Sequence, residues 1–518
     1  MFTTLLELDL SPEQYWTEAL LRESVAHKLG VSVSDLQQVR VVRRSLDSRK
    51  RDVKYHVQLE VSLQGESPLP SAWQPSVYQD CRNKPPLVIV GAGPAGLFAA
   101  LRALEVGLRP IIVDRGKPVE QRKYDISRIT RAKEVNPDSN WCFGEGGAGT
   151  YSDGKLFTRS TKRGDIKEVL RKFVENGADP DIMLDAHAHI GTDRLSRIIA
   201  NMRHTIETYG GEYHFDTRVA DLILKQGRVC GVRCADGNSY EGVAVILATG
   251  HSARDIYQLF FEKGWQLEPK PFALGVRVEH TQHLINSIQY HSQNYSKFLP
   301  PAAYSLTTQV NGHGVFSFCM CPGGIIVPAA TGESQQVVNG MSNSHRNSPF
   351  ANSGIAVTVA PEDVPDYARY GVFSLLKFQQ DVERKVFEAA GGCIDAPSQR
   401  LTDFCQNRTS TRLNKSNYMG QCVSAPLHEV LPDFVVRCLQ QGFRDFDRKM
   451  HGFYTQEASL LAVESRTSSP VRIPRDASLQ HPQLPGLYPC GEGAGYAGGI
   501  VSSALDGINS VTMIAQNS

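Results

Sequence analysis

The chain has 518 residues, of which 41% are hydrophobic and 21% charged, with a formal net charge of +1 at pH 7. This length predicts two or three domains, and the near-zero charge gives no overall argument for a nucleic-acid or membrane partner. Eleven scattered cysteines, with neither a secretory signal nor a transmembrane run, favour a reduced, cytoplasmic setting over a disulfide framework.

Residues 1–64 are predicted to form a small α/β module. Ser11-Pro12-Glu13 has the N-cap, proline and early acid of a helix start. Strands are predicted over 39–44 and 53–61, on either side of a basic turn. That turn has two interpretations, an anion or nucleic-acid contact and an ordinary solvated hairpin, and the second is favoured. Residues 65–84 contain several prolines and are predicted to be a linker.

The clearest motif follows the linker. An apolar strand over 86–90 leads into the G-x-G-x-x-G loop of 91–96 and then into helical spacing. In such a loop the first glycine makes the turn, the second lets a pyrophosphate approach and the third lets the helix pack on the strand. The strand over 110–113 ends in an acid at the spacing of a ribose-binding carboxylate. The predicted dinucleotide contacts are Gly91, Gly93, Pro94, Ala95, Gly96, Asp114 and Arg115.

Two further glycine-rich stretches are predicted to face the same cofactor. Residues 143–155 hold closely spaced glycines without a preceding apolar strand, which suits backbone held against a flat ligand. The alternative, a flexible surface loop, is disfavoured by the large apolar residues in this stretch. Residues 491–500 follow a short strand and open a helix. The predicted contacts are Gly146, Gly147, Ala148, Gly149, Gly491, Glu492, Gly498, Gly499 and Ile500.

Between these stretches the pattern changes from mixed to strand-rich. A helix over 192–209, a hairpin turning at 226–227 and a buried strand over 243–250 are predicted in turn. From residue 268 onward, strands without intervening helices predict an antiparallel substrate domain, followed by a helix over 370–390. The expected domains are a first cofactor part over 85–267, a substrate domain over 268–400 and a returning cofactor part over 401–518.

Six stretches carry a family pattern: 143–155, 251–255, 270–280, 339–342, 464–472 and 491–499. Together they resemble the uncharacterised FAD-dependent dehydrogenase family of bacteria and plastids, over nearly the whole chain. More distantly, the layout is similar to geranylgeranyl reductases and aromatic hydroxylases. The predicted strand over 243–250 ends in Ala248-Thr249-Gly250. Flavoproteins of the two-dinucleotide-binding-domain superfamily share this tripeptide, and in them it lies close to the cofactor. Glu492 departs from that superfamily, in which an aspartate contacts the ribityl chain.

The resemblance implies FAD as cofactor and an α/β fold, a Rossmann-like FAD domain with an inserted β-rich substrate domain. FAD would supply the hydride chemistry while side chains position and tune it. The helix starting near Gly499 is predicted to stabilise negative charge on the flavin. We therefore predict an FAD-dependent oxidoreductase, a dehydrogenase or reductase acting on an unidentified small molecule. Each candidate catalytic residue has a structural ion pair or contact as its alternative. These candidates are Glu145, Lys155, His251, Arg277, His280 and Arg466.

Several alternatives stay open. The alternative function is a flavoprotein that acts on RNA or a protein partner through the basic N-terminal hairpin. Cys319 and Cys321 would allow a disulfide relay, but they lack C-x-x-C spacing, and no second Cys/His pair supports zinc. Because one dinucleotide unit is visible, NADH or NADPH is expected to bind only transiently, and a protein electron donor is the other source. No metal, nucleic-acid partner or membrane span is expected.

Overall fold

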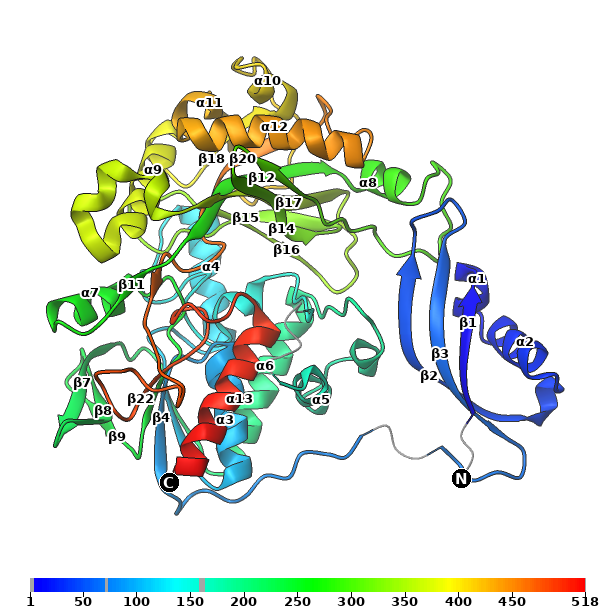
Figure 1. Ribbon diagram of the computed structural model, residues 1–518, viewed down its shortest axis with the longest axis horizontal. Helices are drawn as coiled ribbons and strands as arrows, with labels where there is room; N and C mark the ends of the chain where they lie inside the picture. Colours follow the sequence, from blue (N-terminus) through cyan, green and yellow to red (C-terminus); the bar gives the residue numbers. More distant parts are fainter. Residues whose placement is uncertain (1–3, 70–72, 158–163, 518) are drawn as a thin grey trace.

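The computed structural model describes residues 4–69, 73–157 and 164–517 (Figure 1). Its first part is an antiparallel sheet of order β1-β3-β2 covered by two helices. The elements are β1 (Thr4–Leu10), α1 (Pro12–Trp16), α2 (Glu18–Leu29), β2 (Leu36–Asp47) and β3 (Lys54–Leu63). The helix start predicted at Ser11 is confirmed, because Ser11 and Gln14 exchange the two hydrogen bonds of a capping box.

A five-stranded parallel sheet of order β22-β10-β4-β5-β6 forms the second part. Its strands are β4 (Pro86–Val90), β5 (Arg109–Val113), β6 (Glu212–His214), β10 (Val245–Leu247) and β22 (Leu487–Pro489). The neighbouring helices are α3 (Pro94–Val106), α4 (Val119–Ala132), α5 (Ile166–Glu175), α6 (Thr192–Thr208), α7 (Arg254–Glu262) and α13 (Ile500–Asn517). Figure 1 shows α13, from the end of the chain, lying beside α3.

The hairpin predicted at residues 226–227 is confirmed in a small sheet beside the parallel one. That sheet contains β7 (Val219–Lys225), β8 (Arg228–Cys234) and β9 (Ser239–Glu241). The helix predicted over 192–209 is also confirmed as α6. The strand predicted over 243–250 is shorter than expected, because pairing with β4 and β22 extends only over Val245–Leu247.

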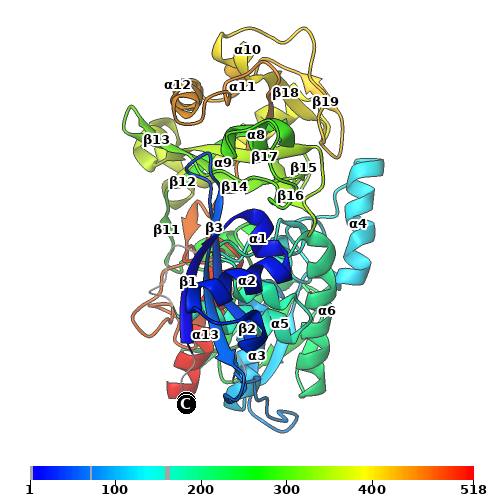
Figure 2. The same ribbon diagram turned by 90° about the vertical axis from the view of Figure 1, so that its right-hand side faces the viewer.

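The third part is a seven-stranded sheet of order β13-β14-β17-β12-β20-β18-β19. It is antiparallel except between β18 and β19. Its strands are β12 (Phe272–Thr281), β13 (Thr307–Val310), β14 (His313–Cys321), β17 (Phe350–Val359), β18 (Ala396–Arg400), β19 (Cys422–Ser424) and β20 (Ser459–Glu464). Figure 2 shows this sheet stacked above the helices of the parallel-sheet part.

Smaller elements surround the seven-stranded sheet. Two short pairs are β11 (Glu268–Pro269) with β21 (Val471–Arg472), and β15 (Gly324–Pro328) with β16 (Val338–Ser342). The helices are α8 (Gln282–Gln289), α9 (Ser374–Ala389), α10 (Leu401–Cys405), α11 (Leu427–Val430) and α12 (Asp433–Lys449). No helix of the described segments is apolar enough over a sufficient length to cross a bilayer.

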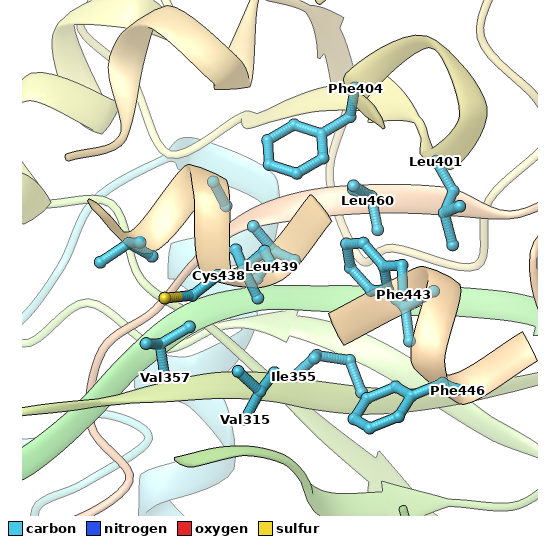
Figure 3. Packing of buried hydrophobic residues seen from close by; sticks show 14 of the residues in the cluster. Val315, Ile355, Val357, Leu401, Phe404, Cys438, Leu439, Phe443, Phe446 and Leu460 are labelled. Atoms are coloured by element: carbon cyan, nitrogen blue, oxygen red, sulfur yellow. The ribbon is translucent and has the colours of Figure 1, made fainter. Parts of the chain in front are cut away.

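Helix α12 covers the outer face of the seven-stranded sheet. Its fully buried Leu439, Phe443 and Phe446 belong to the same core as Ile355 and Leu460 of the strands (Figure 3). Burying each such side chain stabilises the fold by about 1.5–3 kcal/mol. This packing ties residues beyond 400 to the substrate sheet.

The expected domain boundary at residue 400 is therefore wrong, and the expected helix is confirmed with a later start. The substrate part does not end at residue 400, because β19 and β20 complete its sheet and α12 covers it. The helix expected over 370–390 begins only at Ser374, since Gly371 has φ 56° and ψ −125° and interrupts the helical turn before it. The preceding segment, Pro365–Phe373, is a 3-10 helix.

The N-terminal module contacts both larger parts. Arg44, at the end of β2, pairs with Asp181 and Asp185 and donates a 2.8 Å hydrogen bond to the Tyr15 hydroxyl. Its backbone N–H also donates to Leu184, at 2.9 Å. At the other end of the hairpin, His291 lies 2.9 Å from the Ser48 carbonyl. The module is thus anchored beside α5 and beside α8.

Candidate functional site

The glycine loop after β4 leaves open space where a ligand would lie. Gly91 has φ +105°, and a Cβ there would lie 2.4 Å from the Ala248 carbonyl oxygen. A Cβ at Gly93, by contrast, would meet only the Cα of Gly147, at 3.9 Å. Gly93 is the N-cap of α3 and offers no side-chain cap. The first-turn N–H groups of α3 therefore remain available to a phosphate.

Asp114 holds this loop in place, whereas the neighbouring Arg115 pairs with residues outside it. The Asp114 carboxylate accepts hydrogen bonds from the Ala92 N–H at 2.7 Å and the Gly116 N–H at 2.8 Å. Arg115 pairs with Asp138 and Asp255, both at 2.9 Å, and lies 4.4 Å from the centroid of the Phe143 ring. The predicted ribose acid thus has one oxygen on the glycine loop and one on the turn after β5.

A buried arginine organises the second glycine-rich loop. Arg122 of α4 donates to the carbonyls of Asn140, Glu145 and Gly147, each at 2.8 Å. Its guanidinium also lies 4.9 Å from the Tyr151 ring centroid. These contacts hold the Gly147–Tyr151 turn against Gly93, as the 3.2 Å approach of a Gly147 Cβ to the Gly93 Cα indicates.

Glu145 points away from this approach. Its carboxylate accepts from the Val119 N–H at 2.8 Å and from Arg203 Nε at 3.0 Å. Burial raises the pKa of Glu145 to about 7. The structure therefore places this candidate in the support of the loop, between α4 and α6.

The third segment lies where β10 and β22 end. Gly250 has φ +72°, and a Cβ at Gly250, Gly498 or Gly499 would meet no atom within 4 Å. Helix α13 starts at Ile500, directly after this open backbone. Three stretches of bare backbone, following β4, β10 and β22, thus meet at the carboxyl edge of one parallel sheet, the usual ligand position in such sheets.

His251 and Glu492 face each other at this edge. His251 Nδ1 lies 3.5 Å from Glu492 Oε2, and the two side chains are 12% and 30% exposed. Burial raises the pKa of Glu492 to about 7. Burial, followed by the charges of Arg466, Arg254 and Lys270, lowers the pKa of His251 to about 3. His251 Nε2 is buried and has no hydrogen-bond partner in the described chain.

Arg466 joins this corner to the substrate part. It pairs with Glu383 of α9 at 3.1 Å and donates to Ser252 at 3.2 Å and Thr331 at 2.7 Å. Arg254, the first residue of α7, shares the same glutamate, at 2.9 Å. Arg466 was predicted from the sequence, whereas Arg254 and Glu383 were not. Arg254 lies inside the 251–255 family stretch, whereas nothing in the local sequence distinguishes Glu383 from a surface helix acid.

The other candidates lie on the substrate sheet or beside it. Arg277 is fully buried, pairs with Glu464 at 2.9 Å and donates to the Cys319 carbonyl at 2.6 Å. His280 lies 2.8 Å from the Phe453 carbonyl, and burial lowers its pKa to about 4. Lys155 is 36% exposed and 3.9 Å from Asp153. The structure thus brings His251, Arg466 and Glu492 together and leaves Glu145 and His280 in supporting contacts.

Cys319 and Cys321 are free thiols on β14. Cys319 has φ 43° and is exposed, whereas Cys321 is buried and donates to the Cys319 carbonyl at 3.3 Å. Burial raises the pKa of the Cys321 thiol. Cys321 is therefore not held as the thiolate that a disulfide relay needs.

These features fit FAD. The open backbone at Gly93, Gly250, Gly498 and Gly499 has room for an extended ligand. The N-termini of α3 and α13 face that space, which suits a pyrophosphate and the edge of a flavin that becomes negatively charged on reduction. The unpartnered His251 Nε2 adds a buried polar atom at the same edge.

Comparisons with known proteins agree with this assignment. A family model described as "FAD-dependent protein, C-terminal domain-like" matches residues 271–467, and a "Domain of unknown function (DUF8436)" matches residues 3–62. An uncharacterized protein of Clostridium beijerinckii is 38% identical over 509 residues, covering 94% of each chain.

Solved structures give more distant likenesses. The 2,6-dihydroxypyridine-3-hydroxylase of Arthrobacter nicotinovorans is 13% identical with a TM-score of 0.39, over 84% of this chain and 85% of that one. A geranylgeranyl bacteriochlorophyll reductase-like protein of Thermoplasma acidophilum is 10% identical with a TM-score of 0.35, over 83% and 78%. Likenesses this weak assign no chemistry.

Proposed function

The chain belongs to the FAD-dependent protein family that includes the clostridial relative, and from this premise we propose that it is an oxidoreductase acting on a small molecule. The observation that carries the proposal is the meeting of three open backbone segments at the ends of β4, β10 and β22, with His251 and Glu492 beside them. FAD, when bound, supplies hydride transfer at its isoalloxazine ring.

Different segments of the chain would bind different parts of the cofactor and the substrate. The N–H groups at the start of α3 would hold the pyrophosphate, and the second loop, fixed by Arg122, would close over it. The N-terminus of α13 would hold negative charge that develops at the other end of the cofactor. The substrate would approach from the side of the seven-stranded sheet, where Arg277 supports the backbone at Cys319.

Glu492 and His251 are suited to holding a proton at this edge. With a pKa of about 7, Glu492 keeps a proton on its carboxyl oxygens in a large share of molecules at neutral pH. His251, with a pKa of about 3, is a neutral imidazole that accepts or donates according to its tautomer. At 3.5 Å the two side chains are neighbours without a short hydrogen bond between them, so each is free to hydrogen-bond a group bound at this edge.

The experiment is to extract the nucleotide from purified protein and then to test its redox chemistry. Acid release and chromatography should yield FAD, and anaerobic photoreduction followed by a screen of oxidants should reveal a small-molecule class that restores the oxidised spectrum. Protein that stays colourless and cannot be reconstituted with FAD would overturn the proposal.

The ion pairing of the N-terminal hairpin supports a small-molecule substrate over RNA or a protein. Arg44 is occupied by Asp181 and Asp185, Arg49 by Asp47 at 2.7 Å and Lys54 by Asp52 at 3.0 Å. Internal pairing of this kind leaves less positive charge for phosphates. Retention on a heparin or RNA matrix that is lost when the hairpin is neutralised would favour the RNA alternative instead.

A further inference from the structure

The corner beside His251 contains more positive than negative charge. Glu383 is fully buried and is shared by Arg254 at 2.9 Å and Arg466 at 3.1 Å. Although burial raises it, the charges of Arg254 and Arg466 lower the pKa of Glu383 to about 2, so one carboxylate faces two guanidiniums. Lys270 is a third cation beside this corner, where its side chain lies against the segment after β22: a Cβ at Gly495 would be 3.0 Å from Lys270 Cδ. A buried excess of charge is costly unless a partner compensates it.

Helix α7 adds further positive charge to the corner beside His251. It begins at Arg254, three residues after His251, and its N-cap Ala253 provides no side-chain hydrogen bond. The nine-residue helix therefore directs its positive dipole end toward this corner.

Two buried nitrogens at the corner lack a hydrogen-bond partner among the described residues. They are Arg254 Nη1 and His251 Nε2. The two side chains keep exposed fractions of 14% and 12%, so each reaches the solvent-facing edge of the fold. Buried polar groups are normally paired, and two unpaired nitrogens beside excess positive charge indicate a missing anion.

We propose that Arg254, Lys270 and His251, supported by Arg466, form a subsite for an anionic group of the substrate, a carboxylate or a phosphate. The subsite deepens the oxidoreductase function proposed above and rests on it. Glu492 does not oppose such an anion while it is protonated. The substrate would then be an organic acid or a phosphate ester, bound with its charged end at α7 and its reacting carbon nearer the cofactor edge.

The test uses FAD-loaded protein and two probes, benzoate and inorganic phosphate, titrated separately at constant ionic strength. Binding is followed by the flavin difference spectrum and by calorimetry. We expect Arg254→Gln and Lys270→Gln each to raise the dissociation constant of the preferred probe about 10-fold or more, as loss of a charge-assisted hydrogen bond does. The matched control is Arg384→Gln. Arg384 follows Glu383 in the sequence, but it lies in an exposed ion pair with Glu388. The dissociation constant of the probe for this variant should stay within twofold of the wild-type value.

The outcomes separate this inference from the function on which it rests. Weaker binding of benzoate alone assigns a carboxylate, and weaker binding of phosphate alone assigns a phosphate. FAD-loaded protein that binds neither probe, or variants that bind as tightly as the wild type, would overturn the subsite while leaving the oxidoreductase intact. Protein without FAD would instead overturn the function. If Arg254→Gln does not fold, Lys270→Gln gives the decision, because Lys270 is only partly buried.

Discussion

At the residue scale, the space around each glycine shows whether the fold or a ligand requires the absence of a side chain there. Gly91 is closed in by the Ala248 carbonyl, whereas Gly93 has only a Gly147 Cα at 3.9 Å. A Cβ at Gly93 thus meets no close protein atom, and it would occupy the space that a bound pyrophosphate needs. The motif alone gives these glycines their roles, but the structure shows which of them can change without loss of the fold.

We expect Gly93→Val to abolish FAD retention with little change in the fold, because the valine occupies the ligand's space. The measurement pairs the flavin content of the purified variant with its far-ultraviolet circular dichroism and thermal midpoint. Wild-type FAD content in a folded variant would place the cofactor elsewhere.

Glu492 gives a pH-dependent prediction. Burial raises its pKa to about 7 from the ordinary 4.5, so the folded state binds this proton more tightly than the unfolded chain does. The resulting stability is complete below pH 4.5 and is lost as pH rises through 7. Glu492→Gln stays neutral throughout, so we expect its unfolding free energy relative to the wild type to rise by about 1–2 kcal/mol between pH 5 and 8, after allowance for solvent screening.

The measurement is denaturant unfolding of FAD-free protein at several pH values. A difference between Glu492→Gln and the wild type that does not change with pH would show that Glu492 ionises normally.

At the element scale, periodicity and turn chemistry predicted individual helices and hairpins better than they predicted which strands pair in a sheet. The hairpin at 226–227 and helix α6 follow directly from the sequence. Strand β20 was missed because a fully buried strand has no alternation to show its face. The substrate boundary failed for a related reason: only long-range pairing of β20 with β12 and β18 assigns residues beyond 400 to that sheet.

In the candidate site, too, local features could be predicted from the sequence and long-range contacts could not. The backbone that faces the cofactor could be predicted, since glycines at fixed spacing carry that information locally. The ion pair between Arg254 and Glu383 could not, because it joins residues 129 positions apart on two separate helices.

The crossing of α3 and α13 provides a prediction at this scale. A Cβ at Gly507 of α13 would lie 2.1 Å from the Ala95 carbonyl oxygen, so backbone must move to accept it. In α12, a Cβ at Gly442 would lie 2.7 Å from a Val315 methyl group, which can rotate away. We expect Gly507→Ala to cost about 2–3 kcal/mol of unfolding free energy and Gly442→Ala clearly less. Chemical denaturation of both variants decides the point, and an equal cost would contradict the close crossing.

At the scale of the whole molecule, ion pairs and hydrophobic packing attach the N-terminal module, with Val53 in the core of the seven-stranded sheet. Arg44 is 9% exposed and pairs with Asp181 and Asp185, whereas Arg49 is 85% exposed and pairs only with Asp47. The first pair connects the module to the cofactor part, and the second stays within the hairpin. The two arginines therefore form a matched set for measuring the attachment.

We expect Arg44→Ala to cost about 1–2 kcal/mol, because it removes a largely buried guanidinium that bonds the Tyr15 hydroxyl and two partly exposed carboxylates, and Arg49→Ala to cost less than about 0.5 kcal/mol. Thermal unfolding and the rate at which limited proteolysis releases an N-terminal fragment are the measurements. If both variants release the fragment at the wild-type rate, Arg44 does not anchor the module.

The single dinucleotide unit leads to a prediction about electron supply. We expect NADH and NADPH to reduce the flavin slowly in the absence of other substrate, since one glycine-loop unit is evident and it serves FAD. Anaerobic stopped-flow mixing with each nucleotide measures this directly. Rapid, saturable bleaching by either one would contradict the expectation.

The order of the chain also determines when a working molecule can exist. The cofactor edge combines backbone after β4, near residue 91, with backbone after β22, near residue 491. While the polypeptide is still being translated, the first glycine loop is exposed long before its counterpart emerges from the ribosome. Domains generally fold as they are synthesised, from the N-terminus onward. This site, however, needs backbone from near residue 91 and from near residue 491. We expect FAD capture to wait until β22 has been synthesised, and a chain truncated upstream of β22 to lack part of the candidate cofactor site.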